Sequence, residues 1–144
     1  MAVLYMHYMP MNHSFGRSGV FMTLGCGGTC YFTAKSDLSA LFDDIRRVRP
    51  TFMGIVPRIC EMVYQQYQVE LERRSPGAAD LDAIKHELIV EMRNTVLGGR
   101  LLSCNFGSAP LAPELRDFME ASHGYPIDDH YGATEISGAI RNTR

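Results

Sequence analysis

The chain has 144 residues, 46% of them apolar and 21% charged, so it can form one domain with its own core. Its formal net charge of −2 gives no electrostatic reason to expect binding to nucleic acid or to an anionic membrane. No apolar run reaches the length of a transmembrane helix, and the apolar N-terminus lacks the basic start of a signal peptide. Four cysteines without a CxxC pair do not favour a disulfide scaffold or a zinc site, and we expect a cytoplasmic protein.

Strand-forming and helix-forming patterns alternate along the chain. Strands are predicted where β-branched and aromatic residues cluster, at residues 2–9, 29–33, 51–56, 100–106 and 126–131. Helices are predicted where apolar residues recur at helical spacing, over residues 14–25, from the cap Ser36 to Val48, from Pro57 to Leu71, from the cap Asp80 to Val96, and from Pro113 to Met119. In the fourth helix we expect Leu81, Ile84 and Leu88 to face the core.

This alternation predicts an α/β fold with a mostly parallel sheet flanked by helices, because parallel strands need crossover connections. In such sheets, ligands bind beyond the carboxyl ends of the strands. Four polar segments follow predicted strands, namely "MPMNHS", "VPR", "GSAP" and "YGATE". We therefore expect a ligand crevice where these segments meet.

The segment "YGATE", residues 131–135, combines groups that suit a phosphorylated ligand. Gly132 and Ala133 allow backbone N–H groups to approach an anion, Thr134 adds a hydroxyl donor, and Glu135 adds an oxygen ligand of the kind that Mg²⁺ prefers. Tyr131 offers a ring for stacking. A hairpin with a surface threonine and glutamate explains the same residues equally well.

Other candidates have ordinary structural explanations. The small residues Gly107 to Pro110 would let a flat ligand lie against the backbone, but they also suit a plain loop. His13 could hydrogen-bond a carboxylate, or it could be a packing histidine or the neighbour of a helix cap. Arg58 could bind a phosphate, although a structural ion pair with a nearby carboxylate is favoured.

A family resemblance changes this balance. "YGATE" resembles a signature of the adenylate-forming, AMP-binding enzymes, which include acyl-CoA ligases, luciferases and peptide-synthetase adenylation domains. "MPMNHSFG" and "GSAPL" resemble two further motifs of that family, in the same order. The stretches "YFTAKSDLSALFDDIRRVRPT", "VPRI", "VLGGR" and "GSAPLAPEL" resemble the adenylation domain of carboxylic acid reductases and fatty-acid–CoA ligases. The resemblance extends over essentially the whole chain.

The resemblance implies that ATP and a carboxylic acid, such as a fatty acid, form an acyl adenylate. It assigns Thr134 to the α-phosphate and Glu135 to Mg²⁺, and it places His13 beside the substrate carboxylate. The reacting carbonyl would lie against Gly132 and Ala133. The adenine would be framed by Tyr131 with Gly107, Ser108, Ala109 and Pro110. The acyl group would then pass to a thiol, either CoA or a carrier domain, and in a reductase would be reduced to an aldehyde.

Parts of the family pattern have no match in the sequence. These are the phosphate loop with its lysine, the ribose-binding aspartate, and the C-terminal subdomain with its catalytic lysine. Phosphopantetheine and NADPH would belong to further domains of a reductase. We therefore expect residues 1–144 to be a partial adenylation domain from the large N-terminal subdomain, inactive alone. The alternative is a non-catalytic remnant or an association module derived from such an enzyme.

Overall fold

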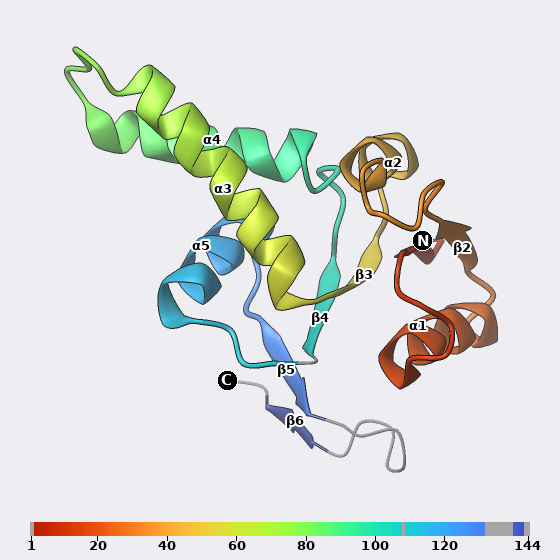
Figure 1. Cartoon of the computed structure of the whole chain (residues 1–144). Coiled ribbons are helices and arrows are strands. Elements are labelled where there is room, and N and C mark those ends of the chain that lie inside the picture. The colour runs from red at the N-terminus through yellow and green to blue at the C-terminus, as the bar shows by residue number, and fades with distance from the viewer. Residues whose placement is uncertain (1, 108, 132–139, 143–144) are drawn as a thin grey trace.

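The computed structural model describes residues 2–107, 109–131 and 140–142, and it forms one six-stranded sheet with helices on both faces (Figure 1). The strands are β1 (Leu4–His7), β2 (Thr29–Phe32), β3 (Phe52–Ile55), β4 (Ser103–Gly107), β5 (Asp128–Tyr131) and β6 (Ile140–Asn142). Their order in the sheet is β2-β1-β3-β4-β5-β6. The first five strands are parallel, and β6 is antiparallel to β5. The mostly parallel α/β prediction is confirmed, whereas β6 was not predicted.

Five helices connect the strands, namely α1 (Ser14–Gly25), α2 (Leu41–Val48), α3 (Pro57–Arg74), α4 (Leu81–Thr95) and α5 (Pro113–His123). Pro57 and Pro113 begin α3 and α5, where a missing N–H costs nothing. The Asp80 side chain accepts a hydrogen bond from the Ala83 backbone N–H and caps α4, as predicted. None of the described helices is long and apolar enough to cross a bilayer.

The two faces of the sheet are covered unequally. The main core lies between the sheet and α2 to α5, and it includes Met53 and Ile55 of β3 with Val63 of α3. On the other face α1 packs against β1, β2 and β3, and it is the one described helix there. There the buried apolar cluster consists of Tyr5, Val20 and Phe52. Successive residues of a strand point to opposite faces, which is why Phe52 and Met53 belong to different clusters.

Helix α1 lies close to the sheet because two of its buried residues are glycines. A Cβ atom added at Gly19 would overlap the ring and hydroxyl of Tyr5. A Cβ atom added at Gly16 would lie 2.9 Å from the Pro10 carbonyl oxygen. Any larger side chain at these positions would push α1 away from β1.

Helix α2 begins later than the sequence predicts. Ser36 is not its cap, because the Asp37 carboxylate accepts the Ser39 N–H at 3.0 Å and turns the chain there. Leu38 then has a φ of 65°, in the left-handed region, and packs against the main core. The helix starts at Leu41 without a side-chain cap. Burial of Leu38 has overridden the local capping preference.

Two further predictions need correction. Leu81 does not face the core but is 43% exposed, because it starts α4 at the end of the α3–α4 hairpin that lies away from the sheet (Figure 1). The strands are shorter than their apolar runs: β1 ends at His7 and β4 begins at Ser103. An apolar run marks a buried segment but does not fix where ladder hydrogen bonds begin.

Candidate functional site

All five parallel strands end at one edge of the sheet, so the segments after them share that edge. Gly107, the last residue of β4, is paired in register with His130 of β5. Tyr131 is the next residue of β5, so its backbone lies beside the end of β4. The two strand ends from which "GSAP" and "YGATE" continue are therefore neighbours, as expected for a shared crevice.

The structure does not describe every predicted site residue. Ser108 and residues 132–139, which contain Gly132, Ala133, Thr134 and Glu135, lie outside the described residues. Ala109 and Pro110 are exposed after β4, before α5 begins. The convergence of these side chains on one crevice therefore stays a prediction, carried by the positions of their strands.

His13 lies at the same edge and caps α1. Its Nδ1 atom accepts the Phe15 N–H at 3.3 Å, and the side chain is exposed. The His13 N–H donates to the Pro10 carbonyl at 3.0 Å, and Arg17 donates to the Asn12 carbonyl at 3.0 Å, which fixes the loop before the helix. The capping bond uses only one ring nitrogen. Capping and a role for Nε2 toward a ligand are therefore compatible.

Arg58 follows Pro57 at the start of α3 and is exposed. None of the ion pairs between described residues includes it. The interpretation of Arg58 as half of a structural ion pair therefore stays a prediction. The residue itself lies directly after the end of β3, at the edge where the predicted ligand crevice opens.

A cavity of about 530 Å³ opens at this edge, where β1, β2 and β3 end. It lies at the topological switch point, because the connection from β1 crosses one face of the sheet and the connection into β3 crosses the other. Its walls are mostly apolar and include Met9, Phe32, Leu38 and Val56. The Val56 N–H donates to the Tyr8 hydroxyl at 3.3 Å, which ties the ends of β3 and β1 together.

His7 lines the same cavity and was missed in the sequence. It is only 2% exposed, and neither ring nitrogen has a hydrogen-bond partner among the described residues. Its ring packs edge-on against Phe32, with centroids 4.9 Å apart. Burial lowers the pKa of His7 below its ordinary value of 6.5, so the imidazole is neutral at pH 7. The available signal was a histidine inside an otherwise apolar strand.

A metal site is not formed by the described residues alone. No group of three His, Cys, Asp or Glu side chains among them could hold a metal ion. The four cysteines are free thiols, and burial raises the pKa of Cys60 to about 12. Glu135, the predicted Mg²⁺ ligand, is outside this set.

Comparison with known proteins identifies the family. A model of the AMP-binding enzyme family matches residues 2–144. The carboxylic acid reductase of Segniliparus rugosus is 46% identical over 138 residues, which is 96% of this chain but 11% of that protein. The chain therefore spans about a tenth of the length of this relative.

Solved structures agree with this match. The adenylation domain of a carboxylate reductase from Mycobacterium chelonae superposes with a TM-score of 0.92 at 42% identity, covering 98% of this chain and 22% of that one. The corresponding domain from Segniliparus rugosus, solved with AMP and a co-purified carboxylic acid, gives a TM-score of 0.87 at 47% identity and covers 95% of this chain and 21% of that one. The chain belongs to the AMP-binding enzyme family.

Proposed function

We propose that this chain supplies part of a site where a carboxylic acid is activated by ATP to an acyl adenylate. The observation that carries the proposal is the pairing of Gly107 with His130, which places the starts of "GSAP" and "YGATE" side by side at the carboxyl edge. Family membership and similarity to a domain solved with AMP and a carboxylic acid support it. Two anions must meet in this reaction, so donors and a metal ion are needed to offset their repulsion.

The roles follow the order of the motifs. Tyr131 with residues 107–110 would frame the adenine, and Thr134 would donate to the α-phosphate. His13 would donate to the substrate carboxylate through Nε2, because Nδ1 is already used in capping. Glu135 would hold Mg²⁺, which supplies charge neutralisation at the phosphates. Gly132 and Ala133 would lie against the reacting carbonyl.

The cavity beside His7 suits an uncharged group and not the phosphates of ATP. The described residues that line it include no lysine or arginine, and most of its walls are apolar. Phosphates would find no compensating charge there. This supports placing ATP at the β4–β5 half of the edge and an uncharged group at the β1–β3 half.

The same resemblance supports a thiol acceptor for the acyl group. We propose CoA or a carrier domain, with phosphopantetheine and NADPH acting in other parts of a reductase-like protein. A fatty acid is the proposed substrate class. These assignments concern the whole protein and go beyond the region that the chain shares with its relatives.

The proposed function is tested with Glu135→Gln in a longer protein that contains this segment. We expect kcat for acid-dependent ATP–pyrophosphate exchange to fall about 100-fold, while KM for the acid changes less than about three-fold, because the carboxylate is assigned to Mg²⁺ and not to the acyl group. Glu87→Gln, an exposed position on α4, is the control and should leave both constants unchanged. An unchanged kcat with a raised KM for the acid would contradict the assignment.

The chain by itself should show negligible exchange, because residues for the β- and γ-phosphates are expected to come from other segments. Robust exchange by residues 1–144 with any fatty or aromatic acid would contradict the proposed division of the site. Pyrophosphate exchange is the suitable measurement because it reports adenylate formation without a thiol acceptor.

A further inference from the structure

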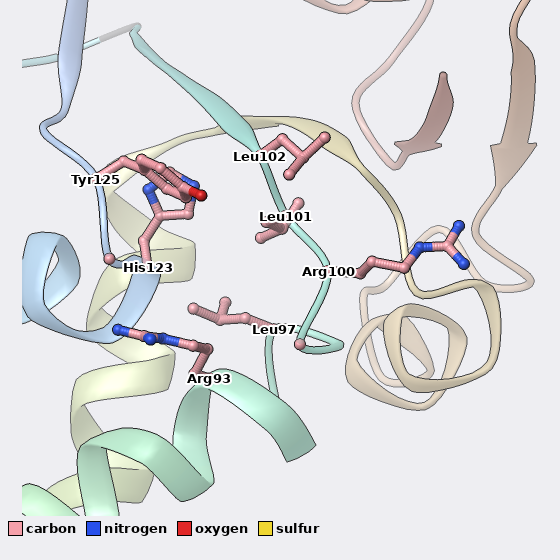
Figure 2. Close-up of a pocket in the computed structure, with 9 residues that line it drawn as sticks. Arg93, Leu97, Arg100, Leu101, Leu102, His123 and Tyr125 are labelled. Carbon is pink, nitrogen blue, oxygen red and sulfur yellow. The ribbon is translucent and has the colours of Figure 1, made fainter. Parts of the chain in front are cut away.

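A second cavity, of about 360 Å³, opens at the opposite, amino edge of the sheet (Figure 2). It lies where α4 ends, where the chain enters β4, and where residues 123–125 lead from α5 to β5. Its volume falls within the range of about 300–1,000 Å³ that is common for small-molecule sites. It is separated from the proposed adenylation site by the length of the strands, so no role proposed above uses it.

One wall of this cavity carries a fixed cation. Arg93 donates from Nε to the Ser122 carbonyl and from Nη2 to the Ala121 carbonyl, both at 2.8 Å. Its guanidinium lies against Gly124, whose φ of 89° and lack of a Cβ atom permit this approach. Figure 2 shows the guanidinium of Arg93 on the side of the cavity opposite Leu101 and Leu102. The cation is held in place before any ligand arrives, and Nη1 has no partner among the described residues.

The same side of the cavity carries a buried imidazole (Figure 2). His123 is 4% exposed, and neither of its ring nitrogens has a hydrogen-bond partner among the described residues. The half-exposed ring of Tyr125 covers it edge-on, with centroids 5.2 Å apart. A buried polar group without a partner is costly, so a ligand or water that pairs with it is favoured.

The charged groups around the cavity favour an anionic ligand. Its described lining residues include two arginines and no carboxylate, although the Arg100 guanidinium points away from the cavity toward α2 (Figure 2). Glu120 on α5 is engaged elsewhere, because its Oε1 atom accepts the Ile127 N–H at 3.0 Å. Burial lowers the pKa of His123, the Tyr125 backbone partly opposes this shift, and the charge of Arg93 lowers the pKa as well. An anion would offset the charge of Arg93 and accept a hydrogen bond from an imidazole N–H of His123.

We propose that this amino-edge cavity binds a small organic oxyanion, a carboxylate or a phosphate monoester. Its oxygens lie between Nη1 of Arg93 and the ring of His123, and its carbon skeleton rests on Leu97 and Leu101, which are buried side chains at the cavity floor. The volume exceeds what an oxyanion head needs, which is why an attached organic group is part of the proposal.

The test is NMR titration of the chain with its histidines labelled at Cε1. The probes are phenyl phosphate, inorganic phosphate, benzoate and the neutral control benzamide. We expect at least one organic oxyanion to cause a saturable shift of the His123 signal and to raise its pKa, so that binding tightens as pH falls from about 7 to about 5. Binding of benzoate alone identifies a carboxylate site, and binding of phenyl phosphate alone identifies a phosphate-ester site.

Matched variants separate this site from general surface effects. Arg93→Gln should weaken binding at least about ten-fold, because a charge-assisted hydrogen bond is lost. Arg100→Gln removes the same charge from a side chain that points away, and should leave binding within about two-fold. His123→Phe keeps a ring but removes both nitrogens, and it should weaken binding even if Arg93→Gln fails to fold.

Four results would overturn the proposal. The first three are the absence of a saturable His123 shift with either organic oxyanion, equal binding of benzamide and benzoate, and an equal response of the exposed His86. The fourth is weakening by Arg100→Gln as large as that by Arg93→Gln, because the effect would then reflect net charge.

Discussion

The two faces of this sheet illustrate different ways of covering a strand layer. On one face four helices bury a continuous core that runs from Met6 to Ile127. On the other face α1 is the only helix among the described elements that contacts the sheet, around Tyr5, Val20 and Phe52. The four-helix face therefore contributes most of the apolar burial, while the α1 face depends on one close helix–strand contact. Large apolar side chains of α1 and β2 remain in solvent there, including Phe21 at 63% exposed.

The largest expected effect concerns that close contact. Gly19→Ala should lower the free energy of unfolding by about 3 kcal/mol, because the new Cβ atom overlaps the buried Tyr5 ring and hydroxyl. Gly25→Ala is the matched control, since no atom lies within 4 Å of its added Cβ, and it should be neutral or slightly stabilising. Urea denaturation measures both, and equal stability of the two variants would show that α1 is free to move.

A second comparison uses the same substitution on each face. Val63→Ala on α3 should cost about 2 kcal/mol, because two buried methyl groups are lost from a closely packed core. Val20→Ala on α1 should cost about 1 kcal/mol, because the thinner α1 layer relaxes more easily around the gap. The difference in unfolding free energy is obtained from the denaturant midpoints of the two variants, with the same dependence on denaturant concentration for both. A larger loss of unfolding free energy for Val20→Ala than for Val63→Ala would contradict this prediction.

A third prediction concerns how stability depends on pH through the buried His7. His7, on the α1 face, has a lowered pKa in the folded state, so the unfolded chain binds more protons and stability falls as pH drops below about 6.5. His7→Phe should therefore lose less stability than the parent between about pH 7.5 and about pH 5. Thermal melting at several pH values checks this. His86→Phe, at an exposed position, should retain the parent profile.

The last prediction concerns self-association of the chain, and it involves the smallest change in folding stability. The apolar side chains Phe21 and Leu24 on α1 and Phe32 on the edge strand β2 are exposed on the α1 face, an arrangement that promotes self-association. Phe21→Ser with Leu24→Ser should change unfolding free energy by less than about 0.5 kcal/mol and reduce association in size-exclusion chromatography. A monodisperse parent chain at all concentrations would contradict this prediction.

The sequence determined the elements and their class. The apolar residues of α3 recur at helical spacing, and Pro57 and Pro113 mark where two helices begin, so these could be predicted from local pattern. Alternation of strands with helices predicted a mostly parallel sheet, and the position of "GSAP" and "YGATE" after strands predicted a shared edge. These features depend on chemistry within a few residues of each position.

Only the tertiary structure decided the remaining features. Strand order placed β1 inside the sheet and β2 at its edge, and neither position is encoded in the strands' similar apolar patterns. The start of α2 moved to Leu41 because Leu38 is drawn into the core. The sequence drew attention to His13 in its polar loop, but burial made His7 and His123 the unpartnered imidazoles. Burial, strand order and unpaired polar groups arise from residues distant in the chain, which is why local patterns did not reveal them.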